Sequence, residues 1–124
     1  MKIQDIQQRL DQLLVESIDE ALYSLGEPVK NYICDRLEEE LLITKHALPQ
    51  QIGEFSKALY RMFGPHARLI EIKCMKTFYS KIKIEQYLEN LSITWDDNDF
   101  TLLTYTDKFR AEAQVIAMQD FSCF

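Results

Sequence analysis

The stretch SLGEPVKNYICDRLEEEL, residues 24–41, predicts the end of one helix and the start of another. Gly26 follows the last apolar position of the preceding pattern, and Pro28 stands where the next helix would begin. Glycine can take the left-handed conformation that ends a helix, and proline suits a first helical turn. A phosphate-binding loop would need more glycines and a preceding strand. Gly26 is therefore interpreted as a turn residue.

Helical spacing of apolar residues continues on the C-terminal side of this turn. The second helix is expected to bury Val29, Ile33, Leu37 and Leu41. A third helix is predicted after Pro49, with inward positions at Ile52, Phe55, Leu59 and Met62 or Phe63. Gly64 is expected to end it as Gly26 ends the first.

A fourth helix is predicted to begin at Pro65. It carries apolar residues on two faces, which are Ala67, Ile70, Cys74 and Phe78 on one and Leu69, Ile72, Met75 and Tyr79 on the other. An element with two apolar faces packs against neighbours on both sides. The fourth helix is therefore expected to be central.

Residues 91–106 permit two interpretations. LSITW alternates like a strand and FTLLTYT is rich in threonine, so a β-hairpin at 91–106 is one alternative. However, apolar residues from the same region onward fall on one helical stripe, namely Leu102, Tyr105, Phe109, Ala113 and Ile116. Asn98 or Asp99 could cap such a helix. A fifth helix is favoured.

These patterns predict an all-α, single-domain bundle of about five helices around a central fourth helix. The expected organisation is an N-terminal helical extension at 1–17, a helical domain at 18–118 and a tail at 119–124.

The first helix shows two apolar stripes. Ile3, Ile6, Leu10 and Leu13 form one, and a second series one position out of phase begins at Leu14. The first stripe is hypothesised to be a partner-binding strip that forms a weak homodimer, because soluble monomers avoid exposing contiguous apolar surface. The alternative is one drifting face within a single core.

Composition restricts the compartment and the partners. The chain has 124 residues, a net charge of −6 and three widely spaced cysteines. Such cysteines suit a reducing compartment, and the absence of a long apolar run argues against a signal peptide or a membrane span. A cytoplasmic location is expected, and the acidic balance makes a general nucleic-acid binder unlikely.

No residue pattern points to catalysis or to a cofactor. His46 and His66, the two histidines, lack a second ligand at metal-binding spacing, and no cysteine or serine has a local activating base. No catalytic, cofactor or metal residue is assigned. An enzyme would require a site assembled from distant residues.

Basic residues concentrate between positions 54 and 83, where the local net charge is +5. The residues hypothesised to form a basic rim are Lys57, Arg61, Lys73 and Lys76. A solvated rim is the simplest interpretation, and a docking surface for an acidic partner is a second. The alternative function is an accessory nucleic-acid-binding domain that uses the basic helices at 54–83.

Residues 18–79 resemble the archaeal Nitrosopumilus output domain family, the fifth of that name and formerly a domain of unknown function. The resemblance rests on several short matches: Leu-Gly-x-x-Val-Lys at 25–30, Leu37 with Ile43, Leu48-Pro49, Glu54-Phe55, Leu59, Phe63-Gly64 and Ile70-Glu71.

The resemblance implies a small helical domain that occurs alone or behind receiver-type signalling modules. It implies a non-catalytic output module in cytoplasmic signal transduction, which binds a protein partner or such a signalling module. It carries over no catalytic residues, and the matched positions are those interpreted above as caps and core.

Overall fold

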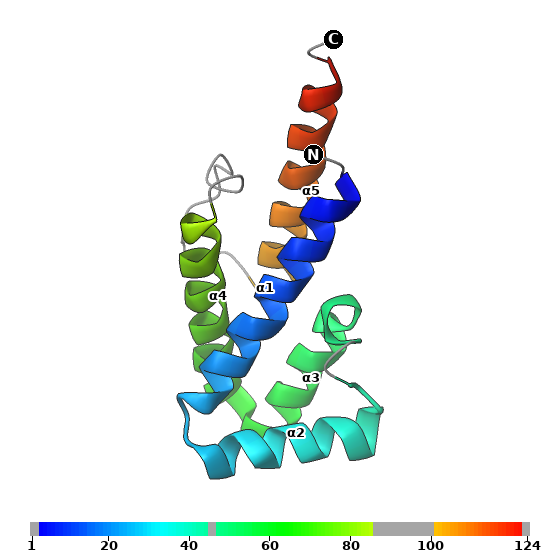
Figure 1. Cartoon of the computed structure of the whole chain (residues 1–124). Helices are drawn as coiled ribbons and strands as arrows, with labels where there is room; N and C mark the ends of the chain where they lie inside the picture. Colours follow the sequence, from blue (N-terminus) through cyan, green and yellow to red (C-terminus); the bar gives the residue numbers. More distant parts are fainter. Residues whose placement is uncertain (1–2, 45–46, 86–100, 123–124) are drawn as a thin grey trace.

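The computed structural model describes residues 3–44, 47–85 and 101–122, which form helices and no strand (Figure 1). The all-α prediction is confirmed. The elements in chain order are α1 (Ile3–Tyr23), α2 (Glu27–Leu41), the 3₁₀ turn η1 (Leu48–Gln50), α3 (Ile52–Phe63), the 3₁₀ turn η2 (Gly64–His66), α4 (Ala67–Ile84) and α5 (Leu102–Ser122). Within the described part of the chain, no helix is both long and apolar enough to cross a membrane.

Three long helices run alongside one another. α4 and α5 both contact α1 and run in the opposite direction to it, while α2 crosses the end of the bundle where α1 finishes (Figure 1). α3 packs against α2, α4 and α5. Because α1 contacts α2, η1, α4 and α5, it shares the central position that was expected for the fourth helix alone.

Aromatic rings fill the space between α4 and α5. The ring of Phe109 makes edge-to-face contacts with Phe78 of α4, at 5.3 Å between centroids, and with Tyr105, at 5.0 Å. All three side chains are at most 1% exposed. Edge-to-face aromatic pairs contribute about 0.5–1.5 kcal/mol beyond the burial of their area. The predicted stripe on the fifth helix is therefore confirmed at Leu102, Tyr105, Phe109 and Ala113, all of which are buried.

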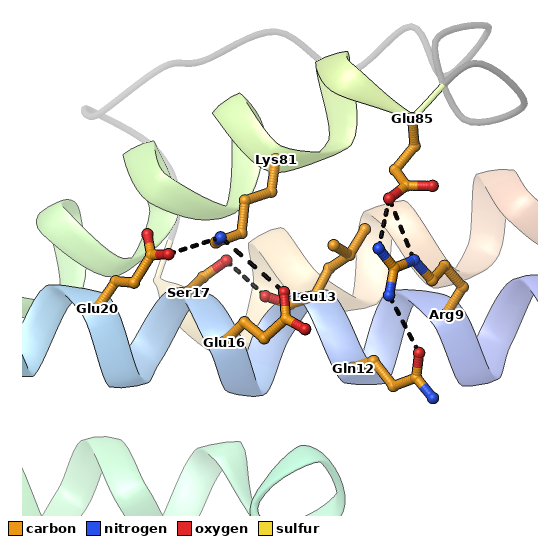
Figure 2. A network of polar contacts seen from close by, with 8 residues as sticks. All are labelled: Arg9, Gln12, Leu13, Glu16, Ser17, Glu20, Lys81 and Glu85. Atoms are coloured by element: carbon orange, nitrogen blue, oxygen red, sulfur yellow. Dashed lines mark hydrogen bonds and ion pairs between the residues drawn. The ribbon is translucent and has the colours of Figure 1, made fainter.

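Polar contacts join α1 to α4 along the edge of this core (Figure 2). Lys81 Nζ lies 2.8 Å from Glu20 Oε1 and 3.9 Å from Glu16 Oε2. Nearer the N-terminus of α1, Arg9 pairs with Glu85 and also donates to Gln12. Such partly exposed pairs contribute only about 0–1 kcal/mol each, so they orient the two helices more than they stabilise them.

Both predicted turn glycines adopt positive φ. Gly26 has φ +104° and ψ 144°, and Gly64 has φ +59° and ψ −139°. These values favour glycine, although neither is the left-handed helical conformation that was expected. Leu42 takes that conformation instead, with φ +55° and ψ +28°, at the end of α2. Its N–H and that of Ile43 both donate to the carbonyl of Leu37.

The hairpin alternative is wrong for the described residues of 91–106, because α5 begins at Leu102. Thr101 caps this helix: its hydroxyl accepts from the N–H of Thr104, and the Thr104 hydroxyl accepts from the N–H of Thr101. This reciprocal arrangement satisfies backbone donors that would otherwise lack partners. The expected caps Asn98 and Asp99 lie outside the described residues.

The expected boundaries at both ends of the chain need correction. Residues 1–17 were predicted to be an extension, but α1 is one continuous helix whose side chains join the common core from Ile6 onward. Residues 119–124 were predicted to be a tail, but α5 continues to Ser122.

Candidate functional site

The hypothesised partner-binding strip on α1 is buried in the domain's own core. Ile6, Leu10 and Leu13 are 3%, 1% and 2% exposed. The side chain of Ile3 lies outside the described residues. Because α1 is covered by α2 on one side and by α4 and α5 on others, it needs a broad apolar face, and the two stripes are parts of that face. The strip is therefore not a dimer surface.

The position where the two stripes meet explains the misinterpretation. Ser17 follows Leu13 at helical spacing, and as a polar residue it interrupts the first apolar stripe in the sequence. The structure buries Ser17 completely, and its hydroxyl donates to the carbonyl of Leu13 (Figure 2). A serine can enter an apolar core when its hydroxyl is satisfied by the preceding turn.

The candidate site is a groove between α3 and the start of α5, called here the α3–α5 groove. Its lining residues are Gly53, Ser56, Lys57, Tyr60, Arg61, Glu71, Thr101 and Leu103. Tyr60 and Leu103 are 41% and 38% exposed and lie in the same groove. An exposed aromatic and an exposed leucine in one groove can anchor an apolar side chain from a partner.

The absence of a side chain at Gly53 keeps this groove open. A Cβ atom built at Gly53 would lie 3.5 Å from Leu103 Cδ2, which is ordinary van der Waals contact. A longer side chain at the same position would therefore fill the space next to Leu103. Gly53 offers a way to block the groove without touching its charges.

Glu71 of α4 lies beneath the groove and is 1% exposed. Its Oε2 accepts from the N–H of Leu102 at 2.9 Å and from the Ser56 hydroxyl at 3.4 Å. A carboxylate at a helix N-terminus is stabilised by the unpaired amides and by the helix dipole, which offsets the cost of burying it. Burial raises the pKa of neighbouring Tyr60, and the Glu71 charge raises it further. Glu71 thus fixes where α5 starts.

The structure divides the hypothesised basic rim into two groups. Lys57 and Arg61 are exposed and line the α3–α5 groove. Lys73 and Lys76 are also exposed, but they lie on the side of α4 opposite to Glu71 and do not line the groove. The groove therefore combines apolar anchors with two exposed cations, Arg61 and Lys57, of which Lys57 has its Nζ 3.7 Å from Glu54 Oε1.

The described cysteines are poorly activated. Cys34 of α2 is partly buried, and burial raises the pKa of its thiol. Cys74 of α4 is fully buried, and burial raises its pKa to about 12. Both thiols stay protonated at neutral pH, the less nucleophilic form. Among the described residues, no group of three or more His, Cys, Asp or Glu is placed to hold a metal ion.

Comparison with known proteins identifies no relative of this chain. No family model, no curated protein and no solved structure matches it. The resemblance over residues 18–79 therefore stays a prediction, and the site must be interpreted from its own residues.

Proposed function

We propose that the chain is a non-catalytic module that binds an acidic segment of a partner protein in the α3–α5 groove. The observation that supports this function is the combination of exposed Tyr60 and Leu103 with Lys57 and Arg61 along one edge. The anchors suit an apolar side chain, and the cations suit carboxylates beside it.

A role in cytoplasmic signal transduction, as an output module for a receiver-type signalling module, belongs to the same proposal. It rests on the resemblance over residues 18–79, in which Glu54-Phe55 and Leu59 of α3 are among the matched positions. Receiver-type modules regulate their outputs through protein contacts, and a groove for an acidic segment supplies one such contact.

The test is a selection of short random peptides against the full chain. Enriched peptides are expected to carry Asp or Glu beside a large apolar residue. Their affinity should fall at least tenfold in Gly53→Leu, which blocks the groove, and in Lys57→Glu with Arg61→Glu, which reverses its charges. Lys73→Glu with Lys76→Glu makes the same change of net charge outside the groove and should leave binding unchanged. Equal losses in both charge variants would overturn the proposal.

A parallel measurement of DNA binding tests the alternative function, in which the chain is an accessory nucleic-acid-binding domain. Lys73 and Lys76 lie on the opposite side of α4 from Glu71, which separates them from Lys57 and Arg61 and limits any continuous basic surface. A mixed-sequence DNA duplex is expected to show no submicromolar binding at physiological salt, because affinity for nucleic acid depends on many neutralised phosphates. Tight binding that disappears in Lys73→Glu with Lys76→Glu would replace protein binding as the proposed function.

A further inference from the structure

A cavity of about 180 Å³ lies between α1, α2 and the segment that leads into η1. Its apolar wall is formed by Ile18, Leu22, Leu37, Ile43, Leu48 and Phe55, all at most 7% exposed. Phe55 belongs to α3, on the face turned away from the α3–α5 groove. The cavity is thus a second site, with its own lining residues.

The polar residues of the cavity are acidic or neutral. Asp19 and Glu38 contribute carboxylates from α1 and α2, and Thr44 contributes a hydroxyl. Among the described residues, Lys30 is a cation at this site, and its Nζ pairs with Asp19 Oδ1 at 2.8 Å. Because this ion pair uses the lysine charge, Glu38 leaves the described residues at the opening with a net negative charge.

The size of the cavity limits what it can hold. An apolar cavity of about 150 Å³ in another protein stays dry and binds benzene. A space of about 180 Å³ can therefore take one aromatic ring or a short branched chain. An anionic group would meet the carboxylates, whereas a cationic group would be attracted to them.

We propose that this cavity binds a small molecule with an apolar body the size of one aromatic ring and a positively charged end beside Glu38. The apolar body replaces the missing packing between α1 and α2. The charged end lies at the opening, where it keeps contact with water. This site shares no lining residue with the α3–α5 groove, so the proposal does not rest on the function proposed above.

Cys34 provides a reporter at the site. It lines the cavity and is partly exposed, whereas Cys74 is fully buried. In a Cys123→Ser background, slow alkylation by iodoacetamide should therefore modify Cys34 first. A molecule bound in the cavity is expected to slow this alkylation.

The experiment compares three probes that share a phenyl ring and differ in charge: 2-phenylethylamine, 2-phenylethanol and 3-phenylpropionate. Binding is measured by NMR titration and by protection of Cys34. The amine is expected to bind at least tenfold more tightly than the carboxylate, with the alcohol between them. Glu38→Gln should weaken binding of the amine and leave the affinity for the alcohol unchanged, because the substitution removes only the carboxylate charge.

Two further variants complete the test. Val15→Phe enlarges a partly buried side chain that lines the cavity, so it should abolish binding of all three probes while circular dichroism shows an unchanged helical fold. Lys57→Glu with Arg61→Glu should not change probe binding. The proposal is overturned if no probe binds at millimolar concentration, if 3-phenylpropionate binds as tightly as the amine, or if bound probe leaves Cys34 alkylation unchanged.

Discussion

The side of α1 that faces α4 and α5 differs from the side that faces α2. On the first side, the rings of Phe78, Tyr105 and Phe109 interlock and ion pairs close the edge. On the second side, the buried residues of α2 among those described are Ile33 and Leu37, at 0% and 6% exposed, and a cavity of about 180 Å³ remains. The comparison indicates that the antiparallel contact between the long helices supplies most of the stability, while the crossing helix leaves space for a ligand.

The largest expected effect comes from a charge placed on the well-packed side. Leu10→Glu should destabilise the fold by about 4 kcal/mol or more, because a carboxylate would be buried without a partner. Chemical denaturation followed by circular dichroism measures the loss. Gln8→Glu, on the exposed face of the same helix, should change stability by less than about 0.5 kcal/mol. A Leu10→Glu variant that stays folded but has a lower mass in solution than the wild type would show that this strip forms a dimer.

Two leucine truncations compare the sides directly. Leu10→Ala and Leu37→Ala should both destabilise within about 2–5 kcal/mol, with Leu10 the larger by about 1 kcal/mol. Leu37 borders the cavity, so it already lacks neighbours on one side and loses fewer contacts when truncated. The measurement is the midpoint of chemical denaturation, compared between variants for which the free energy of unfolding falls with denaturant at the same slope. A larger loss at Leu37 would mean that the α2 side is the better packed one.

How far the sequence alone predicts this structure depends on how local the signal is. Helical spacing predicted the buried face of α5 correctly, from Leu102 to Ala113. It failed for α1, because a helix covered on several sides buries a wider face than one amphipathic stripe. Ser17 is polar and interrupts the stripe in the sequence, yet it lies in the core because its own helix satisfies its hydroxyl.

The groove illustrates the same limit. Lys57 and Arg61 were recognised from local charge, but Gly53 and Leu103 were not, because their contact joins residues fifty positions apart. Leu103 lies one position off the buried stripe, so nothing local marks it as an anchor. Glu71 did carry a signal. It follows Ala67 and precedes Met75 by one helical turn each, so it occupies an inward position.

The pH dependence of stability should report the deep burial of Cys74. The Cys74 thiol ionises near pH 9 when unfolded and near pH 12 when folded, so the folded state keeps a proton between these values. The contribution of this pKa shift to the free energy of unfolding is complete below pH 9 and declines as the pH rises above that value. The loss at pH 10 is on the order of 1 kcal/mol. Denaturation at pH 7 and pH 10 should show a smaller decline in Cys74→Ala. An equal decline in both proteins would contradict the deep burial of Cys74.

The smallest expected effect concerns the end of α2. Leu42 is 80% exposed and holds a left-handed conformation that costs a non-glycine residue about 1–2 kcal/mol. Leu42→Gly removes this strain but adds about 0.5–1 kcal/mol of unfolded-state entropy. A net stabilisation of about 0.5–1 kcal/mol is expected in thermal denaturation. A destabilised variant would show that the exposed leucine makes contacts that support the α2 side.

Among the described elements, α3 is the one whose residues line both the cavity and the α3–α5 groove, through Phe55 on one face and Tyr60 on the other. An occupant that displaced Phe55 would also move the groove wall, so the two binding equilibria would be thermodynamically linked. Linkage is reciprocal: a small molecule that changes the affinity for a peptide by some factor has its own affinity changed by the same factor. Titrating 2-phenylethylamine with and without a saturating groove peptide would give that factor. Titrating the peptide with and without saturating 2-phenylethylamine should give the same value.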